Sequence, residues 1–303
     1  MKFIIVGFGN QGKKRKKILK NDCVAIIDKK KSKSVNYTKI EDVPLNYFDA
    51  VILCTPDHEK IKIINYCIKN KKHVLIEKPL ISKNSSELKI LERNAVKKKV
   101  LLMTAYNHRY EKSLIFLKNN LKAGKIGKIY NCHFKYLNGT AKNVFNTWRD
   151  INNKKGVISD LAPHLIDLIF FLFGEKKISK LNFCLKKNYE NKSKDYCLFS
   201  LTFENIVIQV EVSYCNWKNT FICDVNGKKG SLNVSSLVKW GISKMIFSKR
   251  VLPSGKPIEK KYIFKKPDNS WKEEITAFKK NILRNKKTNL KRDYYINELI
   301  HKL

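Results

Sequence analysis

Lys78 is the first residue of this chain for which the sequence predicts chemistry. It follows a short apolar run, Val74–Ile76, and stands between Glu77 and Pro79. The run predicts a buried strand, and the ligands of open parallel sheets bind just beyond the carboxyl ends of such strands. We therefore expect Lys78 to act on a ligand. The alternative is a strand-end cation that pairs with Glu77.

Asp160 and His164 form a second candidate group. They lie four residues apart at the start of a predicted helix, Leu161–Phe173, and this spacing puts them on one helix face, which Asp167 roughly shares. A histidine beside an acid can exchange a hydroxyl proton near neutral pH. The structural alternatives are an N-cap role for Asp160 and a hydrogen-bonded core position for His164.

A Gly-x-Gly-x-x-Gly motif near the N-terminus predicts a dinucleotide site. It reads Gly7, Phe8, Gly9, Asn10, Gln11 and Gly12. The three glycines allow a tight turn, a close approach of the backbone to a pyrophosphate, and close packing of helix on strand. Asp28 directly follows the second predicted strand, where an acid accepts hydrogen bonds from the adenine ribose. We expect NAD. NADP stays open, because the lysines at 29, 30, 31 and 33 could hold a 2′-phosphate.

The elements that must position these residues alternate between strand and helix over the first 120 residues. Strands are predicted at Lys2–Val6, Cys23–Ile27, Asp49–Cys54, Val74–Ile76 and Val100–Thr104, and helices at Gly12–Asn21, Glu59–Asn70 and Ser85–Lys97. This alternation predicts an α/β domain, a Rossmann doubly wound parallel sheet, over residues 1–120.

Residues 121–303 show a different pattern. Strands are predicted at Lys128–Tyr136, Lys180–Leu185, Cys197–Phe203, Val207–Tyr214, Phe221–Val225 and Gly230–Val234, and helices at Leu161–Phe173 and Trp271–Leu283. Turn residues separate several of these strands. We expect a C-terminal α+β domain with a largely antiparallel sheet.

The basic composition of the chain bears on which partners it can bind. The net charge is +37, with 63 Lys+Arg against 26 Asp+Glu. The basic residues are mostly lysines spread along the chain, whereas DNA-reading proteins cluster their charge and use arginine. We therefore expect no nucleic-acid partner, and we interpret the run Lys13–Lys17 as a solvated helix face. The field of these charges favours anionic small ligands.

Cysteine spacing and hydropathy bear on metal binding and on the cellular location of the protein. The eight cysteines show no metal-ligand spacing, so we expect no metal. No stretch approaches the roughly 20 apolar residues needed to cross a bilayer. The segment Met1–Val6 leads directly into a strand pattern without the layout of a signal peptide. We expect a cytoplasmic protein with no membrane partner.

The chain resembles the Gfo/Idh/MocA family of NAD(P)-dependent oxidoreductases, the glucose–fructose oxidoreductase and inositol dehydrogenase group. The resemblance covers nearly the whole chain. It rests on the segments Gly7–Gly12, Asp49–Pro56, Lys72–Pro79, Asn107–Tyr110, Trp148-Arg149 and Gly156–Asp167. Two departures are Arg15 and Lys60, which stand where many members have histidine.

The resemblance implies hydride transfer between a nicotinamide cofactor and a ring hydroxyl of a sugar, nucleotide sugar or cyclitol. His164 would exchange the hydroxyl proton, Lys78 would polarise the oxygen, and Asp160 would orient the substrate or the proton relay. The further contacts that it implies are Thr55, Pro56, His58, Glu77 and Lys78 for the cofactor, and Lys78, Arg109, Trp148, Arg149, Asp160 and His164 for the substrate.

The resemblance also implies that the C-terminal α+β domain, residues 121–303, serves substrate binding and oligomerisation, and that its open sheet forms the interface of a homodimer or homotetramer. A non-catalytic, dinucleotide-sensing regulator of the same fold is the alternative function, against which the intact Lys78, Asp160 and His164 argue.

Overall fold

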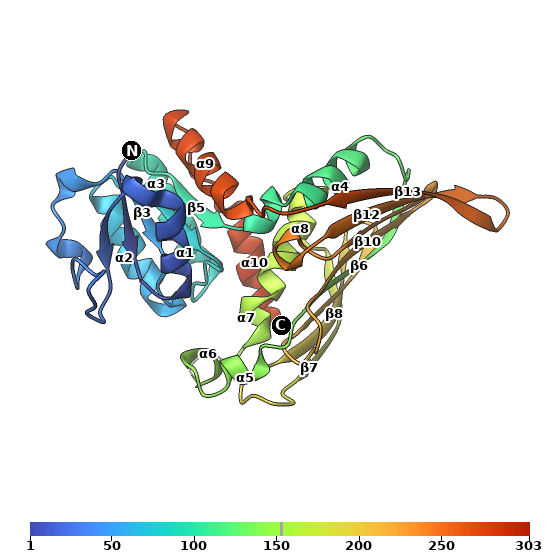
Figure 1. Cartoon of the computed structure of the whole chain (residues 1–303), viewed down its shortest axis with the longest axis horizontal. Coiled ribbons are helices and arrows are strands. Elements are labelled where there is room, and N and C mark those ends of the chain that lie inside the picture. Colours follow the sequence, from blue (N-terminus) through green and yellow to red (C-terminus); the bar gives the residue numbers. More distant parts are fainter. Residues whose placement is uncertain (152–153) are drawn as a thin grey trace. The chain divides into compact units, whose positions relative to one another are not determined.

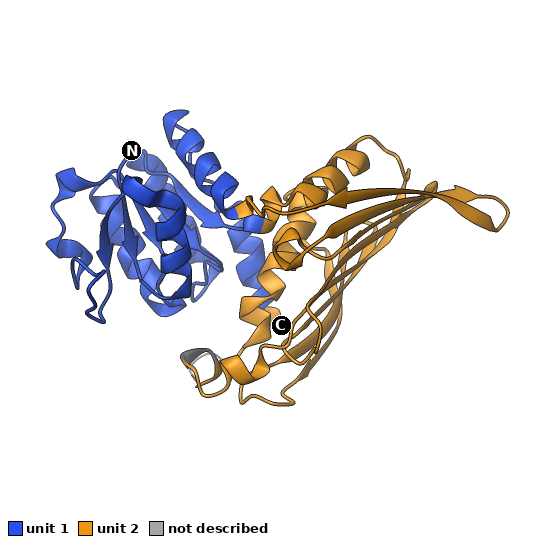
Figure 2. Cartoon of the chain, in the orientation of Figure 1, with its two compact units in different colours: residues 1–107, 271–301 blue, residues 108–270, 302–303 orange. Residues whose placement is uncertain are grey.

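The computed structural model describes residues 1–151 and 154–303, apart from the side chains of Trp148 and Arg149. The chain forms two compact units (Figure 2). Unit 1 comprises Met1–Asn107 and Trp271–His301, and unit 2 comprises His108–Ser270 and Lys302–Leu303. This division differs from the expected 1–120 and 121–303, because Ile275 and Phe278 of the C-terminal segment are buried in a core of unit 1.

Unit 1 is built on a parallel five-stranded sheet with the order β2-β1-β3-β4-β5 (Figure 1). Its strands are β1 (Phe3–Val6), β2 (Cys23–Ile27), β3 (Ala50–Leu53), β4 (His73–Glu77) and β5 (Leu102–Ala105), and its helices are α1 (Asn10–Leu19), α2 (Asp57–Lys69), α3 (Ser85–Lys97), α9 (Ser270–Leu283) and α10 (Lys291–Lys302). The strand order changes direction at β1, which has β2 on one side and β3 on the other. The predicted doubly wound sheet is therefore confirmed.

Both faces of this sheet are buried, because alternate residues of a strand face opposite sides. Ile4 and Val51 belong to a core that includes residues of α2, α3 and α10. Ile5 and Ile52, their neighbours in sequence, belong to a core with residues of α1 and α9. Strands that are buried on both faces appear in the sequence as short continuous apolar runs, which is how they were predicted.

Unit 2 is built on an eight-stranded sheet with the order β13-β12-β11-β10-β6-β9-β8-β7. Its strands are β6 (Ile129–Leu137), β7 (Lys180–Lys187), β8 (Tyr196–Phe203), β9 (Ile206–Ser213), β10 (Thr220–Gly227), β11 (Gly230–Ser235), β12 (Ser243–Val251) and β13 (Gly255–Phe264). Among these eight described strands, only β6 and β9 pair in parallel, and the other neighbours are antiparallel. The expected largely antiparallel sheet is confirmed.

Helices α4 and α8 pack on one face of this sheet (Figure 1). The helices of unit 2 are α4 (Lys112–Lys122), α5 (Ala141–Val144), α6 (Trp148–Ile151), α7 (Val157–Asp160) and α8 (Ala162–Phe173). Short 3-10 turns in the chain cover Lys20–Asp22, Ile40–Asp42, Leu45–Tyr47, Asn107–Tyr110 and Val238–Trp240. Among the described residues, no helix has the length and apolar character to cross a membrane.

The sequence patterns predicted neither β12 and β13 nor α4 and α10. Strand β13 reads GKPIEKKYIF, and nearly all of its residues are exposed. Its apolar alternation is therefore too weak to distinguish it from a lysine-rich loop. Helix α10 reads KRDYYINELIHK, with several charged and polar residues between its apolar positions.

Candidate active site

The Gly7–Gly12 turn joins β1 to α1 and has a different spatial constraint at each glycine. Gly7 has a φ of +94°, and a Cβ there would lie 2.7 Å from the carbonyl carbon of Cys54. A Cβ on Gly12 would lie 2.2 Å from the carbonyl oxygen of Gly7. A Cβ on Gly9 would meet no described atom within 4 Å. Gly7 and Gly12 are thus required by the turn itself, whereas Gly9 leaves room for a ligand to approach the backbone.

The N-terminus of α1 suits an anionic ligand. Gly9 is the N-cap, no described side chain caps this end of the helix with a hydrogen bond, and the first turn holds no acidic residue. The first N–H groups of a helix lack partners within the helix, and the helix dipole favours negative charge there. The backbone N–H groups of Gly9, Asn10 and Gln11, next to Phe8, thus fit the diphosphate of a dinucleotide.

Asp28 is held beside this turn. Its Oδ2 accepts the N–H of Phe8 at 2.6 Å, and its Oδ1 accepts the N–H of Lys30 at 2.9 Å. Each carboxylate oxygen has a second lone pair that can accept a ribose hydroxyl. The nearby Lys29 is exposed and forms an ion pair with Glu59.

Thr55, Pro56 and His58 lie where β3 ends and α2 begins. A Cβ on Gly7 would lie 2.9 Å from the backbone nitrogen of Thr55, so the structure places Thr55 beside the glycine turn. Pro56 is the N-cap of α2. The side chain of His58, in the first turn of α2, is 73% exposed and lies 3.7 Å from Glu59. These residues share the carboxyl-end edge of the sheet, where such folds bind ligands.

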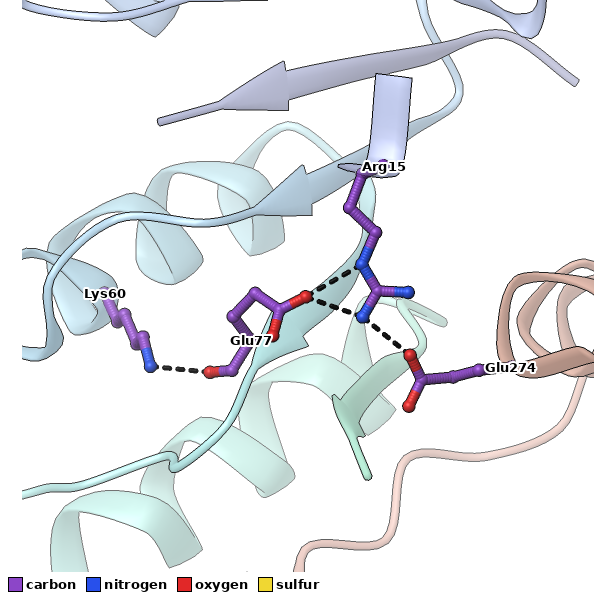
Figure 3. A network of polar contacts seen from close by, with 4 residues as sticks. All are labelled: Arg15, Lys60, Glu77 and Glu274. Carbon is purple, nitrogen blue, oxygen red and sulfur yellow. Dashed lines mark hydrogen bonds and ion pairs between the residues drawn. The ribbon is translucent and has the colours of Figure 1, made fainter. Parts of the chain in front are cut away.

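A buried polar network surrounds the end of β4, where Glu77 precedes Lys78 (Figure 3). Arg15 of α1 binds Glu77 Oε1 through Nε at 2.8 Å and through Nη2 at 2.6 Å. The same Nη2 lies 2.6 Å from Glu274 Oε2 on α9. Lys60 of α2 donates to the carbonyl oxygen of Glu77. The Lys78–Pro79 peptide bond is cis.

Arg15 corrects the interpretation of the basic run as a solvated face. Its side chain is fully buried, while Lys13, Lys14 and Lys17 are exposed. Burial lowers the pKa of Arg15, but the carboxylates of Glu77 and Glu274 outweigh this effect, and the net pKa is raised. Sequence reasoning missed Arg15, Lys60 and Glu274 as a group.

In unit 2, Asp160 and His164 lie on either side of the junction between α7 and α8. Asp160 is the last residue of α7, and the N-cap of α8 is Leu161, so Asp160 is not the N-cap of that helix. Asp160 Oδ2 accepts the hydroxyl of Tyr214 at 2.9 Å. Tyr214 therefore helps to fix the carboxylate, and it was not among the predicted site residues.

His164 is 8% exposed and lies in an aromatic cluster. Its ring stacks on His108, with 4.3 Å between the ring centroids and 25° between the planes. Tyr136 contacts His164 edge-on at 5.7 Å, and Trp240 lies 5.7 Å from Tyr136. The cluster holds the imidazole in one orientation, which a proton-transfer group requires.

Lys239 adds a cation to this cluster. Its Nζ donates to the hydroxyl of Tyr136 at 2.7 Å and lies 4.7 Å from the centre of the Trp240 ring. Burial lowers the pKa of Lys239 to about 8, although the charges of Asp268, Glu111 and Asp160 oppose the shift. A single lysine in a lysine-rich sequence gave no signal by which this position could have been predicted.

Arg109 has a defined partner in unit 2. Its Nε donates to both carboxylate oxygens of Asp167, at 3.1 and 2.8 Å, and its guanidinium lies 5.5 Å from the centre of the Phe171 ring. The structure thus pairs Arg109 with a residue of α8 that lies about one helical turn after His164. The side chains of Trp148 and Arg149, expected to contact substrate, lie outside the described residues. No group of His, Cys, Asp and Glu in the described ranges could hold a metal ion.

The sheet, the glycine turn and Asp28 define unit 1 as a dinucleotide-binding domain. Residues 1–106 match the family model described as oxidoreductase family, NAD-binding Rossmann fold. Residues 118–293 match the oxidoreductase family, C-terminal alpha/beta domain. The chain belongs to this Gfo/Idh/MocA family of NAD(P)-dependent oxidoreductases, as its motifs predicted.

The chain is similar to several named dehydrogenases in sequence or in fold. The scyllo-inositol 2-dehydrogenase (NADP+) of Bacillus subtilis is 26% identical over 259 residues, which cover 78% of this chain and 68% of that protein. Some other inositol dehydrogenases match over smaller shares of their own length. Levoglucosan dehydrogenase in complex with NADH superimposes with a TM-score of 0.83 at 17% identity, over 99% of this chain and 95% of the other. UDP-N-acetylglucosamine 3-dehydrogenase from Acidithiobacillus ferrooxidans has a TM-score of 0.81 at 15% identity, over 100% of this chain and 96% of the other.

Proposed function

We propose that the protein oxidises a ring hydroxyl of a sugar, nucleotide sugar or cyclitol to a ketone, or catalyses the reverse reduction, with NAD or NADP. The observation that carries the proposal is the buried His164 beside Asp160, in a chain whose other unit has a complete dinucleotide turn. The named relatives, which include inositol, levoglucosan and UDP-N-acetylglucosamine dehydrogenases, support this substrate class.

The cofactor, when bound, supplies a hydride acceptor or donor. The backbone at Gly9 and the N-terminus of α1 would hold its diphosphate, and Asp28 would accept hydrogen bonds from the adenine ribose. Thr55, Pro56, His58 and Glu77 would complete the cofactor contacts along the carboxyl edge of the sheet. A free ribose hydroxyl suits Asp28 better than a 2′-phosphate, so we favour NAD over NADP.

Lys78, Asp160 and His164 would act on the reacting hydroxyl. During oxidation His164 accepts the hydroxyl proton, and during reduction it returns that proton to the oxygen. Lys78 donates a hydrogen bond that polarises the oxygen, and Asp160, fixed by Tyr214, orients the substrate or the proton relay. Arg109, Trp148 and Arg149 would shape the substrate site. The net charge of +37 favours anionic substrates such as nucleotide sugars.

The test compares Lys78→Ala and His164→Ala with Lys89→Ala, an exposed lysine on α3. The substrates are scyllo-inositol, levoglucosan and UDP-N-acetylglucosamine, each with NAD+ and NADP+. We expect the first two variants to lose about 10²- to 10⁴-fold in turnover while they still bind NADH. Lys89→Ala should match the unmodified protein. Unchanged turnover in both site variants would contradict these roles.

We also propose a homodimer or homotetramer formed through the C-terminal sheet, and a cytoplasmic location. The face opposite α4 and α8 carries half-buried apolar residues, among them Leu198, Ile222 and Ile246, between polar ones. All eight cysteines are free thiols, which suits a reducing compartment. Sedimentation analysis of the purified protein tests the assembly, and a monomer at micromolar concentration would contradict it.

A further inference from the structure

Lys60 is a buried lysine whose bonds flank the proposed catalytic lysine. Only 1% of Lys60 is exposed. Its Nζ donates to the carbonyl oxygen of Glu77 at 2.5 Å and to that of Pro79 at 2.7 Å, and it forms an ion pair with Asp57 Oδ1 at 2.7 Å. The two carbonyl groups belong to the residues immediately before and after Lys78. One side chain therefore holds the main chain on both sides of Lys78.

The side chain of Glu77 is fixed independently. Arg15 of α1 binds its carboxylate and also contacts Glu274 (Figure 3). The guanidinium of Arg15 lies 4.5 Å from the centre of the Trp271 ring. The ladder between β4 and β5 ends at Glu77, so the sheet register does not fix the chain beyond that residue. From Lys78 onward, the bond from Lys60 to Pro79 replaces the ladder as a constraint.

We propose that Lys60 is a positioning residue that holds the backbone of Lys78 in the geometry needed for catalysis. This inference rests on the function proposed for Lys78. A methionine would fill a similar volume, but it would leave the two buried carbonyl oxygens without this donor. Catalytic groups need such support, because a displacement of about 1 Å can cost about 10²-fold in rate.

Hydrogen exchange of the full-length protein without substrate tests the clamp directly. We expect Lys60→Met to speed amide exchange in residues 76–81 by about tenfold or more, because losing these bonds eases local opening. Lys62→Met, an exposed position on the same helix, should leave this exchange unchanged. Unchanged exchange in folded Lys60→Met overturns the proposal. If that variant does not fold, Lys60→Gln decides in the same way: faster exchange supports the clamp and unchanged exchange overturns it.

Turnover of the panel substrate that the unmodified protein accepts separates positioning from a structural role. We expect Lys60→Met to lower kcat about 10- to 100-fold, with the Kd for NADH within about twofold. Lys60→Arg should restore part of kcat, since a guanidinium can donate to both carbonyls. A normal kcat in Lys60→Met overturns the proposal if Lys78→Ala shows its expected loss of turnover. If Lys78→Ala keeps its turnover, the proposed function fails instead, and the exchange result still decides whether Lys60 holds this backbone.

Discussion

Replacing Lys239 by methionine should change the pH dependence of stability in a calculable way. Burial lowers the pKa of Lys239 from 10.5 to about 8. Between these values the unfolded chain holds a proton that the folded chain has released. The free energy of unfolding therefore rises with pH across this window on account of Lys239. Below about pH 8 the folded state carries the full cost of burying the charge.

The magnitude follows from the size of the shift. Each pKa unit corresponds to about 1.4 kcal/mol, so the fall from 10.5 to about 8 gives at most about 3–4 kcal/mol. Lys239→Met removes this cost, which is largest below about pH 8 and vanishes near pH 10.5, whereas it removes the hydrogen bond to Tyr136 at every pH. The stability of the variant relative to the unmodified protein should thus be most favourable near pH 7 and should fall by about 3–4 kcal/mol toward pH 10.5.

Urea unfolding, followed by far-UV circular dichroism at a series of pH values from about 7 to 10, measures this difference. Lys256→Met, at an exposed position in β13, is the matched control and should show a flat difference over the same range. A pH-independent difference for Lys239→Met would refute the reasoning, as would a change of the opposite sign. A flat difference would mean that the charge of Lys239 is as stable in the folded chain as in the unfolded one, and the opposite sign would mean that folding raises its pKa.

Three further predictions concern unit 1. Gly12→Ala puts a Cβ 2.2 Å from a carbonyl oxygen of the turn, so fluorescence titration should show NADH affinity at least about tenfold lower. Asp28→Asn removes the charge that suits a ribose hydroxyl, so the ratio of NAD+ to NADP+ affinity should fall, and an unchanged ratio would speak against this role. Glu274→Ala leaves the buried Arg15 with one carboxylate fewer, so urea unfolding should show a loss of about 3–5 kcal/mol, compared with little change for the exposed Glu273→Ala.

The sequence predicted most of the first unit because each of its signals is local. The Gly7–Gly12 motif, the apolar runs and the amphipathic helices depend on residues close together in the chain, and the alternation of strands and helices indicates a parallel sheet. The return of α9 and α10 to unit 1 was not predictable in this way. It depends on contacts such as Phe278 with Phe3, whose ring centroids lie 6.4 Å apart, between opposite ends of the chain.

The candidate site shows the same difference between residues with a local sequence signal and residues that only long-range contacts bring in. Lys78, Asp160 and His164 were chosen for their chemistry and their place at element ends, and the structure describes Asp160 and His164 at one helix junction. Their supporting residues lie far along the chain: Tyr214 directly follows β9, and Lys239 is in the 3-10 turn Val238–Trp240. Nothing in their local sequence distinguishes them from ordinary core or surface residues.

Two of the missed cations, however, do have a sequence signal that follows from physical chemistry. Arg15 shares the buried face of α1 with Gly12 and Leu19, and Lys60 shares the buried face of α2 with Ile64. A charge on an apolar helix face must meet partners, because burying it alone is far too costly. In a chain with a net charge of +37, the number of basic residues does not identify individual sites, but a basic residue at an apolar position of the helical period indicates a buried polar network. Both residues meet that network at the same place, the end of β4 beside Lys78. Arg15 and Lys60 lie on the buried faces of two helices that flank the same parallel sheet. Such a pair of buried cations indicates that the end of a strand between the two helices carries the hydrogen-bond acceptors of both.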